Sequence, residues 1–142
     1  MILCGWAKEY DNNLMNPGID YTLVICTYNP DERILKRCLE AVRVLDRTGI
    51  ITETILVDNN SNIPVESLAY VRDYTVTIPG MKPLFVKQQG VQFARMAAIE
   101  EAKGKQIVYF DYDNEPASDY LQVLKELNKN YINVAAWGPG NV

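Results

Sequence analysis

Short apolar runs alternate with amphipathic stretches along this chain, and this alternation limits the folds that it can adopt. Residues 21–27 and 54–57 are short, apolar and rich in β-branched side chains, which predicts strands buried on both faces. Residues 106–110 have the same character, and residues 132–137 form a last expected strand. Strands of this kind need helices above and below them. We therefore predict an α/β fold with a mainly parallel sheet and helices on both faces.

The amphipathic stretches between these strands predict the helices. Asn29 is a candidate N-cap, with Pro30 at the first helical position and Glu32 at the spacing of a capping box. A second helix is predicted over residues 90–103, and a third is expected to begin after Ser118 as its cap.

The region between the second and third buried strands gives a weaker pattern. Residues 65–72 form a weak helical stretch. Residues 74–78 and 83–87 are both compatible with strands, the first at the edge of the sheet and the second in its core.

The length of 142 residues corresponds to one domain. Residues 1–19 lack clear periodicity and contain the turn signal Asn16-Pro17-Gly18, so we expect an N-terminal extension followed by a domain over residues 20–142. The net charge of -4 and the pI of about 4.8 argue against DNA or RNA as the main partner.

The sequence shows no apolar run near the roughly 20 residues that a membrane-spanning helix needs. The N-terminus also lacks the basic region and long apolar stretch of a secretory signal. The three cysteines contain no CxxC pair, and two of them fall within predicted strands or helices. We therefore expect a cytoplasmic protein with reduced cysteines and without a membrane segment.

The chain contains no histidine, which restricts its chemistry. Catalysis by Ser-His-Asp or Cys-His groups and most zinc sites are excluded within this polypeptide. Side chains of this chain would hold a metal mainly through oxygen. No GxGxxG or GxxxxGK[ST] motif is present, so the usual glycine-rich phosphate loops are absent.

Polar clusters follow three of the predicted strands: Thr27-Tyr28-Asn29, residues 58–61 and Asp111-Tyr112-Asp113. In parallel sheets, ligands bind beyond the carboxyl ends of the strands, where these clusters would meet. In an extended chain the side chains of residues 111 and 113 would point the same way, and their repulsion favours a cation between them. Mg²⁺ or Mn²⁺ would suit two carboxylates and a diphosphate ligand.

The sequence resembles family 2 glycosyltransferases of the GT-A fold between about Tyr21 and Trp137. The resemblance rests on LVICTYNPDERILKRCLEAV, ETILVDNNS and GVQFARMAAIEEAKGKQIVYFDYD, and on the spacing between them. It implies a Rossmann-like nucleotide-binding half, and an enzyme that transfers a sugar from a nucleotide-diphospho-sugar, a UDP-sugar being favoured, to an unknown acceptor.

The resemblance also implies roles for single residues. Thr27 and Tyr28 would line the nucleotide pocket, and Asp58 would accept a hydrogen bond from the base, usually uracil. Arg95 would lie near the base or the diphosphate. Asp111 would sit near the ribose or the metal, Mn²⁺ or Mg²⁺, and Asp113 would coordinate that metal.

The sequence departs from the family pattern at three positions. Cys26 stands where proline is common, Gln88 where asparagine is frequent, and Met96 where asparagine usually follows the arginine. These departures leave the base and sugar preference open. The family's acceptor half, with its carboxylate general base, normally follows the last strand seen here, so we expect a donor-binding half and identify no catalytic base.

Simpler interpretations exist for several of these residues. Asp58 would then only cap its turn, Arg95 would be a solvated helix residue, and Tyr28 would belong to the core. Three functions remain open: an inverting metal-dependent glycosyltransferase, a sugar-phosphate nucleotidyltransferase, and a non-catalytic module that binds a nucleotide or a partner. Pyrophosphate release from a nucleoside triphosphate would indicate the second, and the absence of turnover the third.

Overall fold

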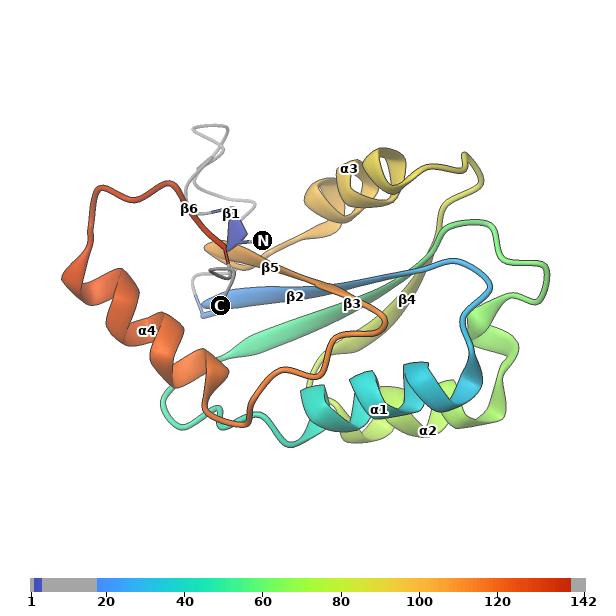
Figure 1. The fold of residues 1–142 in the computed structure, drawn as a ribbon, viewed down its shortest axis with the longest axis horizontal. Helices are drawn as coiled ribbons and strands as arrows, with labels where there is room; N and C mark the ends of the chain where they lie inside the picture. Colours follow the sequence, from blue (N-terminus) through green and yellow to red (C-terminus); the bar gives the residue numbers. More distant parts are fainter. Residues whose placement is uncertain (1, 4–17, 139–142) are drawn as a thin grey trace.

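A six-stranded sheet forms the centre of the computed structural model, which describes residues 2–3 and 18–138 (Figure 1). The strand order is β4-β3-β2-β5-β1-β6. The four strands from β2 to β5 pair in parallel, whereas β1 is antiparallel to both of its neighbours. The prediction of a mainly parallel α/β sheet is confirmed. The strands are β1 (Ile2–Leu3), β2 (Tyr21–Thr27), β3 (Thr52–Asp58), β4 (Met81–Phe85), β5 (Gln106–Asp111) and β6 (Ala136–Trp137).

Helices cover both faces of this sheet, as the buried strands require (Figure 1). Helix α3 lies on one face, where Ala94 and Ala98 pack against Val24 and Ile55. The opposite face carries the larger core, formed with the remaining helices. The helices are α1 (Glu32–Arg43), the short 3₁₀ helix η1 (Val65–Ser67), α2 (Ala69–Thr77), α3 (Val91–Glu101) and α4 (Tyr120–Asn130).

The cap of α1 differs from the prediction. Asp31, not Asn29, precedes the helix, and its Oδ1 accepts from the backbone N–H of Arg33 at 2.9 Å and of Ile34 at 3.2 Å. Asn29 instead has a positive φ of 44°, and its side-chain oxygen accepts from the backbone N–H of Asn62 at 2.8 Å. The prediction of Asn29 as N-cap was wrong because this residue joins two loops.

The segment after η1 also differs from the prediction. Residues 74–78 do not form an edge strand: residues up to Thr77 belong to α2, and Val71 and Ile78 are buried in the larger core while Tyr74 packs against it. β4 lies at one edge of the described sheet, where it pairs only with β3, and it contains Pro83. The prediction of a core strand over residues 83–87 was therefore wrong, since proline suits an edge.

Two further predictions near the C-terminus need correction. Ser118 does not cap α4, because the helix begins at Tyr120 and is preceded by Asp119, whose side chain makes no capping bond. The last strand contains only Ala136 and Trp137, while residues 132–135 lie outside regular structure.

The amino ends of the parallel strands lie toward the left of Figure 1, opposite the carboxyl ends that the polar clusters follow. There, the ammonium of Lys105 lies 3.0 Å from Oδ1 of Asp20. Near this end, Ile2 and Leu3 place a short strand between β5 and β6. Most of the predicted N-terminal extension lies outside the described residues, so its boundary at residue 19 stays a prediction. None of the described helices is long and apolar enough to cross a membrane.

Candidate functional site

A cavity of about 520 Å³ opens at the carboxyl ends of β2, β3 and β5. These ends lie together at the right of Figure 1, and the cavity is bounded on the other side by the start of α3. Parallel pairing brings them together, since Thr27 of β2 is in register with Asp58 of β3, and Cys26 with Asp111 of β5. The lining residues are Cys26, Thr27, Tyr28, Asn59, Gln89, Gly90, Val91, Ala94, Asp111, Tyr112 and Asp113.

Asp111 and Asp113 both line this cavity, although not for the reason that the sequence suggested. β5 ends at Asp111, and the chain then turns: the N–H of Asn114 donates to the carbonyl of Asp111 at 2.9 Å. The side-chain oxygen of Asn114 accepts from the N–H of Asp111 at 3.0 Å, which closes the turn from the other side. The assumption of an extended chain at residues 111–113 was wrong, and a turn brings the carboxylates to one cavity.

The two carboxylates form a donor set that fits a hard divalent cation. Asp111 and Asp113 are both exposed at the cavity and offer only oxygen. Across residues 2–3 and 18–138, no group of three or more acidic, cysteine or histidine side chains could enclose a metal. Mg²⁺ and Mn²⁺ commonly bind through one or two carboxylates together with waters and substrate phosphates. The residues therefore fit a cation that a diphosphate ligand also holds.

Arg95 supplies positive charge beside these carboxylates. Its Nη2 lies 3.8 Å from Oδ1 of Asp111, and its guanidinium carbon lies 5.5 Å from the ring centre of Tyr109. Its Nε is buried without a hydrogen-bond partner. Arg95 is not among the residues that line the cavity, so the structure places it next to the acidic pair rather than in the cavity wall.

Thr27 and Tyr28 lie at the carboxyl end of β2 and line the cavity, while their contact with a nucleotide stays a prediction. The hydroxyl of Thr27 donates to the carbonyl of Val57 at 2.9 Å and is thus used within the sheet. Tyr28 is 50% exposed, so its ring is not a core side chain and can meet a planar ligand.

Asp58 does not line the cavity. Its carboxylate is buried, with Oδ1 accepting from the N–H of Ser61 and Oδ2 from the N–H of Val65, both at 2.9 Å. These contacts match the simpler interpretation, in which Asp58 caps the turn after β3. A contact between Asp58 and a base stays a prediction.

Asn59 lines the cavity in place of Asp58, although no role was predicted for it. Its buried side chain bonds to the backbone of residues 86–90. No strand pattern distinguishes it, because β3 ends at Asp58 and Asn59 belongs to the polar cluster that follows. Gln89, Gly90 and Val91 also line the cavity without having been predicted.

Cys26 lies at the cavity with a thiol that stays protonated near neutral pH. Burial raises the pKa of Cys26 to about 11, against the smaller, opposite effect of Arg95. Burial likewise raises the pKa of the Tyr109 hydroxyl to about 12. Neither group provides an anion near neutral pH, so the negative charge of the site comes from Asp111 and Asp113.

Sequence comparison finds relatives over nearly the whole chain. The model of the family described as glycosyl transferase family 2 matches residues 22–139. An N-acetylglucosaminyltransferase of Neorhizobium galegae is 29% identical over 133 residues, which is 93% of this chain and 30% of that protein. The chain thus spans less than a third of the length of this curated relative.

Solved structures with a similar fold include proteins in complex with UDP or GDP-Man. Staphylococcus aureus TarS in complex with UDP matches with a TM-score of 0.68 and 19% identity, over 80% of this chain and 33% of that one. The mannosyltransferase PcManGT from Pyrobaculum calidifontis, in complex with GDP-Man and Mn²⁺, gives a TM-score of 0.63 and 26% identity, over 75% of this chain and 32% of that one. The likeness to TarS concerns the fold alone.

Proposed function

Because the chain belongs to glycosyl transferase family 2, we propose that its cavity binds the nucleotide-diphospho-sugar donor of an inverting glycosyltransferase. The observation that carries this proposal is the meeting of Tyr28, Asp111 and Asp113 in one cavity of about 520 Å³ at the carboxyl edge of the sheet. An exposed aromatic ring can stack on a nucleotide base, and two carboxylates can bind the metal of a metal-bound diphosphate. UDP is the favoured nucleotide, since TarS is similar in fold and binds it.

The residues at the cavity have distinct parts in this proposal. Asp111 and Asp113 would hold Mn²⁺ or Mg²⁺, and the bound cation would supply positive charge for the leaving diphosphate. Tyr28 stacks on the base, and Arg95 adds positive charge beside the acidic pair. We assign no base for the acceptor hydroxyl among the described residues; the acceptor and its activation belong to a part of the enzyme beyond this cavity.

A calorimetric titration of UDP tests the proposal, in Mn²⁺ and again in EDTA. We expect binding in Mn²⁺ that weakens at least tenfold in EDTA and in Asp113→Asn. The matched control is Asp119→Asn, which removes an exposed carboxylate outside the cavity and should bind as the unchanged protein does. Equal affinity in Mn²⁺ and EDTA would contradict the role of the acidic pair.

Turnover assays separate the alternative functions. Hydrolysis or transfer of a UDP-sugar would support the glycosyltransferase, and pyrophosphate release from a nucleoside triphosphate would indicate a nucleotidyltransferase. UDP binding with neither reaction would favour a module that binds a nucleotide without turning it over.

A further inference from the structure

We propose that Asn59 is a positioning residue that holds residues 86–90, named here the wall segment, in place as a preformed side of the cavity. The inference rests on the proposed function, because it concerns the fit of the donor nucleotide to this cavity. It assigns to Asn59 no contact with the ligand. Asn59 acts through the backbone that it binds.

The side chain of Asn59 bonds to three backbone groups of the wall segment. Its Nδ2 donates to the carbonyl of Gln88 at 2.7 Å and to that of Val86 at 3.3 Å. Its Oδ1 accepts from the N–H of Gly90 at 2.7 Å. The amide therefore uses both N–H donors and its carbonyl, and the partners fix which atom is nitrogen and which is oxygen.

Burial increases the contribution of these three hydrogen bonds to the conformation of the wall segment. Asn59 is only 7% exposed, so water replaces them poorly if they are lost. The wall segment itself is different: Lys87, Gln88 and Gln89 are exposed, and the backbone here is neither helix nor strand. A segment without regular structure needs contacts of this kind to keep one conformation.

Asn59 is itself fixed to the sheet. Its backbone N–H donates to the carbonyl of Thr27 at 2.9 Å, which ties it to the end of β2. Thr27 also lines the cavity, so Asn59 contacts one part of the lining through its backbone and another through its side chain. The distance between these parts is thus set before any ligand arrives.

The conformation of the wall segment requires a glycine at residue 90. Its φ of +132° lies in a region that residues with a side chain rarely adopt, and an added Cβ would lie 2.9 Å from Oε1 of Gln92. Gly90 lines the cavity directly before α3. The hydrogen bond from its N–H to Asn59 therefore fixes the last residue of the wall segment, directly before α3 begins.

The test combines Asn59→Ala with the matched control Asn62→Ala. Asn62 lies in the same loop, is exposed, and contributes a backbone N–H that the substitution keeps. We expect Asn59→Ala to raise the Kd for UDP in Mn²⁺ at least tenfold and to speed hydrogen exchange of the Gly90 amide at least tenfold. Asn62→Ala should change neither value by more than twofold.

A merely structural role would give a different result. If Asn59→Ala lowers the melting temperature but binds UDP within twofold of the unchanged protein, the proposal is overturned. If the variant does not fold, hydrogen exchange of the unchanged protein without ligand tests the proposal. Its Gly90 amide should then exchange at least tenfold more slowly than its Gln89 amide. Equal exchange would overturn the proposal.

The exchange measurement also separates this inference from the proposed function. If the unchanged protein binds no UDP in Mn²⁺, the proposed function fails. A slow Gly90 amide would then still support the contact with Asn59, while a fast one would overturn the inference on its own.

Discussion

At the scale of single residues, Cys26 carries a thiol at the cavity, and its surroundings keep this thiol neutral. The shift of its pKa from 9.0 to about 11 lowers the thiolate fraction near pH 8 roughly 100-fold. We expect iodoacetamide to label Cys26 about 100-fold more slowly at pH 8 than it labels a cysteine in a short peptide, with the rate rising steeply toward pH 11. Peptide mass spectrometry measures the rate at each cysteine.

Urea provides the control for this prediction. Unfolding removes the burial that raises the pKa, so the difference from the peptide should vanish in urea. Fast labelling of Cys26 in the folded protein at pH 8 would contradict a partly buried, neutral thiol.

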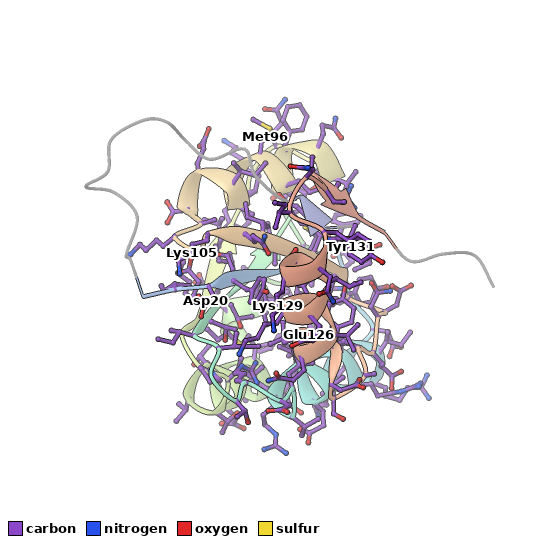
Figure 2. All side chains as sticks on the ribbon, turned by 90° about the vertical axis from the view of Figure 1, so that its left-hand side faces the viewer. Asp20, Met96, Lys105, Glu126, Lys129 and Tyr131 are labelled. Carbon is purple, nitrogen blue, oxygen red and sulfur yellow. The ribbon has the colours of Figure 1, made fainter. Side chains whose placement is uncertain are left out.

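Tyr28 gives a second prediction at this scale. Stacking of a base on an aromatic ring contributes about 1–3 kcal/mol by alanine substitution, so Tyr28→Ala should weaken UDP binding by that amount. Its stability should change little, because the ring is half exposed. Tyr131→Ala is the control, since Tyr131 is 56% exposed, follows the end of α4 (Figure 2) and does not line the cavity. Calorimetric titration measures the affinity of both variants for UDP. Equal affinities of Tyr28→Ala and Tyr131→Ala would contradict stacking.

The residues of the site differ in how far the sequence reveals them. Thr27, Tyr28, Asp111 and Asp113 could be placed at the cavity because they directly follow or end parallel strands. Asn59 could not be separated from its neighbours in a polar cluster, since its partners lie about 30 residues away. Only the folded chain shows that its amide is used by the backbone.

At the scale of helices and strands, Gly104 limits how β5 approaches β2. A Cβ on this residue would lie 2.4 Å from the backbone N of Thr22 and 2.7 Å from the backbone C of Tyr21. The backbone would have to shift, so Gly104→Ala should lower the free energy of unfolding by about 1–3 kcal/mol or more. Urea denaturation measures this change.

Gly138→Ala is the matched control for this prediction, because a Cβ there meets nothing within 4 Å. We expect a change of less than about 0.5 kcal/mol, as for an ordinary surface substitution. Equal effects of the two substitutions would contradict the close approach at Gly104.

The existence of most strands and helices could be predicted, but their exact ends and their caps could not. β2, β3 and β5 are apolar enough to be recognised as buried strands, and all three pair as expected. Residues 74–78 were misassigned because Val71, Tyr74 and Ile78 follow a helical spacing that begins before the segment. Caps depend on short-range geometry, and Asp31 competes with Asn29 only two residues away.

At the scale of the whole molecule, the topology explains why a site exists here at all. Parallel pairing of β2, β3 and β5 aligns three carboxyl ends, and each end carries polar residues. Such an edge is where α/β sheets bind ligands. This rule allowed the place of the site to be predicted from the sequence. The contribution of β1 to the sheet could not be predicted, because a strand of two residues carries no periodic pattern.

The central claim is that this edge holds a nucleoside diphosphate through a metal at Asp111 and Asp113. The most direct measurement is paramagnetic broadening of backbone amide signals by substoichiometric Mn²⁺ in the presence of UDP. We predict that the signals of Tyr28, Gly90 and Tyr112 are lost while those near Asp20 and Lys105, at the other end of the strands (Figure 2), stay sharp. Broadening centred on Asp20, or none at the cavity, would contradict the account.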